Sequence, residues 1–174
     1  MEYSNKEKIG LFLRHRIPLA ATLILMFLFF VPINSLQLSY FRPSIGIICV
    51  YYWTVKRGYM FGYFSAFIVG FLMDVYSSSP LGLNIFAMML LMFMTDWTVR
   101  YFQSSFSLSW FLFGILTLGI TLFKWLILMV YSEKILVLWE VLVNYCSTLM
   151  FYPFVCVINL WVQKRFLPPE RMNE

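Results

Sequence analysis

Three ionisable side chains, Asp74, Lys124 and Glu140, lie inside or at the end of long apolar runs. In a bilayer such a charge is costly unless it is paired or close to water. Lys124 and Glu140 could form an ion pair or a short proton relay. A short turn near residues 132–134 joins the two runs that carry them, which places them at similar depth on adjacent, antiparallel helices. We expect an intramembrane pair, with Lys124 reaching the outer headgroups alone as the alternative.

Asp74 ends a run in which small residues recur at every fourth position. These residues are Gly58, Gly62, Ala66 and Gly70. Lipid provides little hydrophobic drive for helix association, so close backbone approach replaces it and requires small side chains. The spacing predicts a packing stripe along a central helix over residues 58–75, which faces another helix or a partner. The plainer alternative is that glycine is simply common in membrane helices.

Asp74 is expected at the outer end of that helix, on the side where Arg42 begins the preceding apolar segment. Asp74 either pairs with Arg42 or is a solvated carboxylate at a helix end. The following turn has Ser79 as the expected N-cap and Pro80 at the expected start of the next helix. We expect the charge pair and the turn to shape the outer face of the protein. The residues concerned are Arg42, Pro43, Asp74, Pro80, Leu81 and Gly82.

No catalytic, phosphate-binding or metal-binding motif is recognisable in the chain. The only histidine, His15, lies among arginines, where an interfacial role is expected. Asn144 and Asn159 are expected to form hydrogen bonds between helices. Three cysteines lie in apolar runs and are expected to be buried thiols: Cys49, Cys146 and Cys156. We therefore expect no enzymatic activity, no cofactor and no bound metal.

The amino-acid composition of the chain predicts the secondary-structure elements that position these side chains. Of the 174 residues, 61% are apolar and 12% are charged, against about 45–50% and about 25% in soluble domains. The apolar runs do not alternate with polar residues, so helices are expected instead of transmembrane strands. The sequence predicts an all-α integral membrane protein, a compact bundle of six transmembrane helices. The expected segments are residues 17–36, 40–55, 58–75, 81–98, 107–131 and 135–162.

The distribution of basic residues predicts the orientation of this membrane domain, residues 17–162. If the N-terminus is cytoplasmic, ten of the 13 Lys and Arg residues lie inside, whereas Arg42 and Lys134 lie outside. We expect residues 1–16 and 163–174 to be cytoplasmic segments. The basic balance is explained by anionic lipid headgroups and requires no nucleic acid.

Several short motifs together resemble the rod-shape-determining protein MreD family. They are Phe41-Arg42-Pro43, Tyr52-Trp53, Gly62, Gly70-Phe-Leu-Met-Asp74 and Pro80-Leu81-Gly82. The resemblance is densest from Phe41 to Asn84, and beyond that region it is one of hydropathy and length. The sequence departs from the family at Ser44, where an acidic or amide residue is common.

The resemblance implies a non-enzymatic scaffold of the cell-elongation complex, located in the bacterial inner membrane. Such proteins bind the bitopic protein MreC and so connect MreB filaments to the SEDS glycosyltransferase and its penicillin-binding transpeptidase. The implied fold is similar to the six-helix substrate-binding subunits of energy-coupling-factor transporters. Two alternatives are a substrate-binding subunit of a vitamin-type transporter and a lipid-handling protein with a cavity near Lys124 and Glu140.

Overall fold

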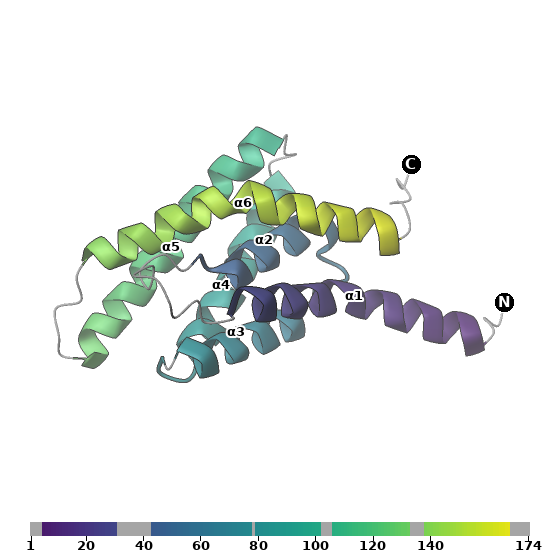
Figure 1. Cartoon of the computed structure of the whole chain (residues 1–174), viewed down its shortest axis with the longest axis horizontal. Coiled ribbons are helices and arrows are strands. Elements are labelled where there is room, and N and C mark those ends of the chain that lie inside the picture. Colours follow the sequence, from purple (N-terminus) through teal and green to yellow (C-terminus); the bar gives the residue numbers. More distant parts are fainter. Residues whose placement is uncertain (1–4, 31–42, 78, 102–105, 133–137, 168–174) are drawn as a thin grey trace.

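The computed structural model describes residues 5–30, 43–77, 79–101, 106–132 and 138–167, and these form helices and turns without a strand (Figure 1). The expected all-helical architecture is confirmed. The helices are α1 Asn5–Phe30, α2 Ile45–Arg57, α3 Tyr63–Ser77, α4 Leu83–Tyr101, α5 Phe106–Ser132 and α6 Leu138–Phe166.

Two helical segments in the described part of the chain are long and apolar enough to cross a bilayer, Leu108–Tyr131 and Leu138–Phe166. Two shorter apolar helices cover Arg16–Phe29 and Tyr63–Ser77. The number of membrane crossings therefore stays a prediction.

The short helix α2 forms the centre of the bundle, where it packs against α1, α3, α4 and α6 (Figure 1). Every residue from Ile45 to Thr54 is buried. The expectation that the helix beginning at residue 58 would be central is wrong. The physical reason is that one side of α3 carries large aromatic side chains which face outward, including Phe64 at 64% exposed and the stacked rings of Phe67 and Phe71.

Several helix boundaries differ from the expected segments. Helix α1 begins at Asn5 instead of residue 17, because basic residues continue a helix beyond the apolar part. The chain turns at residues 58–62, so α3 begins only at Tyr63. Arg57 accepts two hydrogen bonds at its carbonyl oxygen, from the N–H groups of Met60 and Phe61, and these bonds close the turn.

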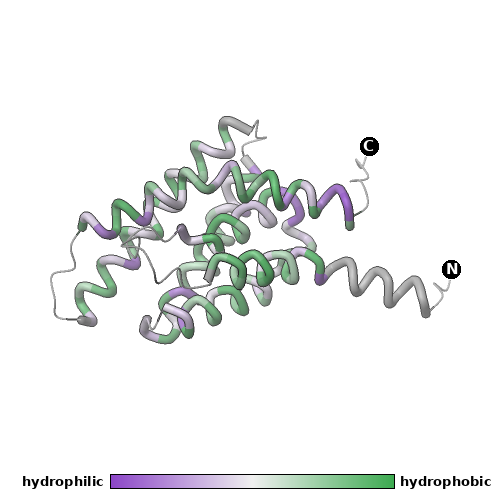
Figure 2. Tube along the Cα trace, viewed as in Figure 1, coloured by the Kyte–Doolittle hydropathy of each residue, from purple (hydrophilic) through white to green (hydrophobic). Residues whose placement is uncertain are grey.

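The outer surface of the bundle is largely apolar. Figure 2 shows hydrophobic residues along most of the helices and a hydrophilic stretch at the C-terminal end of α6. Large apolar side chains on α5 and α6 are exposed, among them Val130 at 82% and Met150 at 70%. Contiguous apolar surface of this kind marks contact with lipid or a partner.

Candidate functional site

The carboxylate of Asp74 holds the end of α3 to the start of α4. Its Oδ1 atom accepts hydrogen bonds from the backbone N–H of Asn84 (2.9 Å) and the hydroxyl of Ser79 (3.0 Å). Its Oδ2 atom accepts the backbone N–H of Gly82 (2.9 Å). Asp74 is 1% exposed. A carboxylate from one helix thus satisfies free N–H groups at the N-terminus of the next, where negative charge is favourable.

This arrangement corrects the expected capping of α4. The helix begins at Leu83, so Pro80 precedes it and does not occupy its first position. The Ser79 hydroxyl donates to Asp74 and accepts a hydrogen bond from the side-chain amide of Asn84 at 3.0 Å. The capping function expected of Ser79 therefore belongs to Asp74.

Gly82 gives the turn its shape. Its φ angle is +103°, a conformation that costs a residue with a Cβ atom free energy and that glycine adopts readily. This conformation presents the Gly82 N–H to Asp74. The neighbouring Leu81 side chain is 74% exposed, so it lies on the outside of the turn.

Gly70 allows α3 to approach the start of α4. A Cβ atom added to Gly70 would lie 2.6 Å from the Cα atom of Ile85 and 2.9 Å from the backbone oxygen of Asn84. Ala66, one turn earlier, is fully buried. Gly70 and Asp74 together hold α3 in direct backbone contact with the start of α4.

The other two members of the small-residue series do not lie on α3. A Cβ atom added to Gly62 would meet nothing within 4 Å, and one added to Gly58 would lie 3.0 Å from the backbone oxygen of Thr54 on α2. Both residues belong to the turn between α2 and α3. The expected single stripe along one helix is therefore wrong at Gly58 and Gly62, because the chain turns there.

Asn84 completes the junction, and the sequence reasoning did not assign it a role. Its side-chain amide donates to the hydroxyls of Ser77 (3.3 Å) and Ser79 (3.0 Å). Asn84 is 2% exposed, and its Oδ1 atom has no hydrogen-bond partner among the described residues. An amide ten residues after Asp74, at the start of an apolar run, was the signal that could have indicated it.

The expected Arg42–Asp74 pair stays a prediction, because Arg42 lies outside the described residues. The chain directly after it is anchored to α6. The backbone N–H of Ser44 donates to the hydroxyl of Thr148 (3.1 Å), and the Ser44 hydroxyl donates to Asn144 Oδ1 (3.3 Å). The expected role of Asn144 in joining helices is confirmed. Pro43, next to Ser44, is half-buried.

Asn159 joins α6 to α2, as expected. Its side-chain amide donates to the sulfur of Cys49 (3.5 Å) and to the backbone oxygen of Val155 (3.1 Å). Cys49 and Cys156 are buried free thiols, which confirms their expected state. Cys146 is exposed, which contradicts the expectation of burial.

The structure does not bring Lys124 and Glu140 together. Glu140 is exposed, and no ion pair joins it to Lys124 in the described part of the chain. The Lys124 side chain, in contrast, is half-buried. The physical reason is that α5 also packs on α4, where the rings of Phe86 and Phe123 lie 5.6 Å apart. Lys124 follows Phe123 on α5.

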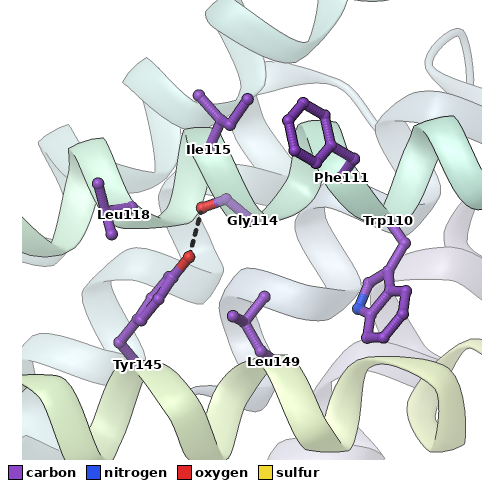
Figure 3. Close-up of a pocket in the computed structure, with 7 residues that line it drawn as sticks. All are labelled: Trp110, Phe111, Gly114, Ile115, Leu118, Tyr145 and Leu149. Carbon is purple, nitrogen blue, oxygen red and sulfur yellow. Dashed lines mark hydrogen bonds between the residues drawn. The ribbon is translucent and has the colours of Figure 1, made fainter.

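An apolar groove of about 540 Å³ lies between α5 and α6 (Figure 3). Gly114 lies on the α5 side, and the hydroxyl of Tyr145 donates to its backbone oxygen at 3.0 Å. Figure 3 shows Tyr145 and Leu149 extending from α6 toward Gly114. The residues that line the groove are Trp110, Phe111, Gly114, Ile115, Leu118, Tyr145 and Leu149.

Neither the groove nor the Asp74 junction has the composition of a metal centre. Among the residues that the structure describes, no group of three or more His, Cys, Asp or Glu side chains could hold a metal ion. The side chains can form hydrogen bonds at the junction and apolar contacts in the groove.

The fold and the site define an α-helical membrane protein in which a buried carboxylate holds two helix ends together. The chain belongs to the MreD family, because the family model described as rod shape-determining protein MreD matches residues 7–161. Its role is therefore in determining rod shape, and the resemblance inferred from the short motifs is confirmed. No curated protein and no solved structure matches the chain, so the similarity to energy-coupling-factor subunits stays a prediction.

Proposed function

We propose that the chain is a non-enzymatic scaffold of the bacterial cell-elongation complex that binds the bitopic protein MreC. In this proposal MreC connects it to MreB filaments and to the SEDS glycosyltransferase with its penicillin-binding transpeptidase, and so supports lateral-wall peptidoglycan synthesis. Membership of the rod-shape family supports the biological setting. The groove between α5 and α6 is the observation that supports a docking surface.

The groove suits a single apolar helix from a partner. Its α5 side includes the outward-facing Phe111, Ile115 and Leu118, which are 67%, 53% and 41% exposed. Gly114 lies among them without a side chain, so a partner backbone could approach closely there. Membrane helices associate through such close packing, which makes the membrane helix of MreC the proposed occupant.

From the sequence alone, the small-residue series is a candidate for this surface. Ala66 and Gly70 are buried against other parts of the same chain, so they serve internal packing. We accordingly propose that the partner contacts α5 and α6, while α3 and α4 keep the bundle rigid.

The test is to fill the groove with a side chain. In the Gly114→Leu variant, the added atoms enter the space beside Leu149 and Tyr145, whose nearest atoms lie 3.5 and 3.6 Å from a Cβ at this position. We expect co-purification with MreC to fall at least about tenfold, the factor that corresponds to 1.4 kcal/mol, and rod-shaped cells to become rounded. Unchanged co-purification would contradict the docking proposal.

Gly119→Leu is the matched control, because it makes the same change on the same helix. A Cβ atom at Gly119 would meet nothing within 4 Å, and Gly119 does not line the groove. We expect this variant to retain MreC. Gly114→Ala is a second control, since a single methyl group fits at ordinary contact distance and should leave both folding and binding nearly unchanged.

A further inference from the structure

A second cavity, of about 190 Å³, lies between α2, α5 and α6. It shares no lining residue with the groove of Figure 3. The residues that line it are Tyr52, Val55, Lys56, Ser109, Tyr152, Cys156, Val157 and Leu160. This cavity belongs neither to the Asp74 junction nor to the groove between α5 and α6, so the roles proposed for those two sites do not account for it.

One wall of the cavity is built from buried polar groups. Ser109 and Tyr152 are 8% and 3% exposed, and their hydroxyl oxygens lie 3.4 Å apart. Tyr52, at 5% exposed, donates its hydroxyl hydrogen to Gln163 Oε1 at 2.9 Å. These hydrogen bonds fix the positions of the side chains, so the wall keeps its shape whether or not the cavity is filled.

Lys56 supplies a positive charge at the edge of the same cavity. Its side chain is exposed and lines the cavity together with Cys156. None of the residues that line the cavity is acidic. The cavity thus offers one cation to a ligand and no carboxylate that would repel an anion.

The apolar part of the lining opens to the outside of the bundle. Val157 and Leu160 line the cavity and are 66% and 39% exposed. Lys164 and Arg165 directly follow Gln163 in the last turn of α6, the end of the helix where Figure 2 shows a hydrophilic stretch. Clusters of Lys and Arg next to a membrane helix attract anionic lipid headgroups.

We infer that this cavity binds one anionic phospholipid, with an acyl chain against Val157 and Leu160 and the phosphate group at Lys56. The combination of an apolar opening, buried hydroxyls and a single cation matches the three parts of such a lipid. In this arrangement a hydrocarbon chain packs against the apolar side chains, and the glycerol ester region lies beside the hydroxyl groups. The phosphate group pairs with the Lys56 ammonium group.

The experiment is lipid retention by the full-length protein, measured by native mass spectrometry from detergent containing equal amounts of phosphatidylglycerol and phosphatidylcholine with the same chains. We expect one phosphatidylglycerol per chain, preferred at least about fivefold, the factor that one lysine supplies at an anionic surface. Lys56→Gln should abolish the preference, and because Lys56 is exposed, the variant should fold normally. Equal preference in the wild-type protein and Lys56→Gln would overturn the inference.

Lys164→Gln is the matched control, because Lys164 is also exposed but does not line the cavity. An equal loss of preference in this variant would show diffuse surface attraction and overturn the site. Val157→Trp should fill the opening and reduce retention of both lipids. Displacement of the lipid by millimolar glycerol phosphate would show that the acyl chain is unnecessary, which would also overturn the inference.

The lipid site is independent of partner docking. Lys56→Gln should leave co-purification with MreC unchanged, whereas Gly114→Leu should leave lipid retention unchanged. The two proposals can therefore fail separately.

Discussion

Gly70 of α3 lies against Ile85 of α4 so closely that a methyl group on Gly70 would stand 2.6 Å from the Ile85 Cα atom. The neighbouring atom is backbone, which cannot rotate away as a side chain could. The carboxylate of Asp74, one turn later on α3, binds the first turn of α4. Packing and hydrogen bonding therefore act on the same junction.

We expect Gly70→Ala to destabilise the protein by about 1–3 kcal/mol, the usual cost of overpacking a close contact. The thermal unfolding midpoint in detergent measures this change. Gly62→Ala is the control, because a Cβ atom there meets nothing within 4 Å. Equal midpoints for Gly70→Ala and the wild-type protein would show that the two helices can separate without loss.

Asp74→Asn tests the capping carboxylate. The amide keeps one acceptor oxygen and replaces the other with a donor, which faces the N–H of Gly82 or Asn84. A buried N–H group is then left without a partner, at a cost of about 1–3 kcal/mol. The same unfolding measurement applies, with Glu140→Gln as a control because Glu140 is exposed. A neutral effect of Asp74→Asn would mean that these backbone bonds contribute little.

Gly82→Ala tests the backbone conformation of the turn. With φ at +103°, the added Cβ atom meets no neighbour within 4 Å, so any loss comes from backbone strain and not from a collision. We expect about 1–2 kcal/mol of destabilisation, read from the unfolding midpoint. If Gly82→Ala were as stable as the wild-type protein, the turn would have to adopt another conformation without cost.

The contact of α3 with α4 was predictable in part because the four-residue spacing of Ala66, Gly70 and Asp74 falls within one helix. The same spacing misled at Gly58 and Gly62, since glycine is as suited to a turn as to a close helix contact. Hydropathy also could not reveal that α2 is central. A helix that is enclosed by other helices can have any length, so the 13-residue length of α2 does not indicate that it lies at the centre of the bundle.

The membrane orientation stays a prediction that fusion proteins can test. In Figure 1 the Asn5 end of α1 and the Phe166 end of α6 lie at the same end of the molecule, as expected if both termini are cytoplasmic. Green fluorescent protein fused after Glu174 should fluoresce, and alkaline phosphatase fused there should be inactive. Phosphatase fused after Tyr131 should be active, and the opposite pattern would reverse the orientation.

The partner of Lys124 could not be read from hydropathy, because apolar runs give the depth of a residue and not the rotation of its helix. Depth alone favours Glu140, but Glu140 is exposed, and Phe123, the residue before Lys124, packs on Phe86 in the first turn of α4. Asp74 caps that same turn through the N–H of Asn84. A double-mutant cycle distinguishes them. We expect Lys124→Met and Asp74→Asn to be coupled by at least about 0.5 kcal/mol of unfolding free energy, and Lys124→Met and Glu140→Gln to be additive.

One outcome of the Lys124 double-mutant cycle would contradict this prediction. Coupling of Lys124 to Glu140, with additivity toward Asp74, would restore the pair expected from depth and would require α5 to be rotated relative to α4. The ring contact between Phe86 and Phe123 provides an independent check. Because Phe123 precedes Lys124 on α5, Phe86→Ala should weaken the Lys124–Asp74 coupling if α4 and α5 together hold Lys124 in place.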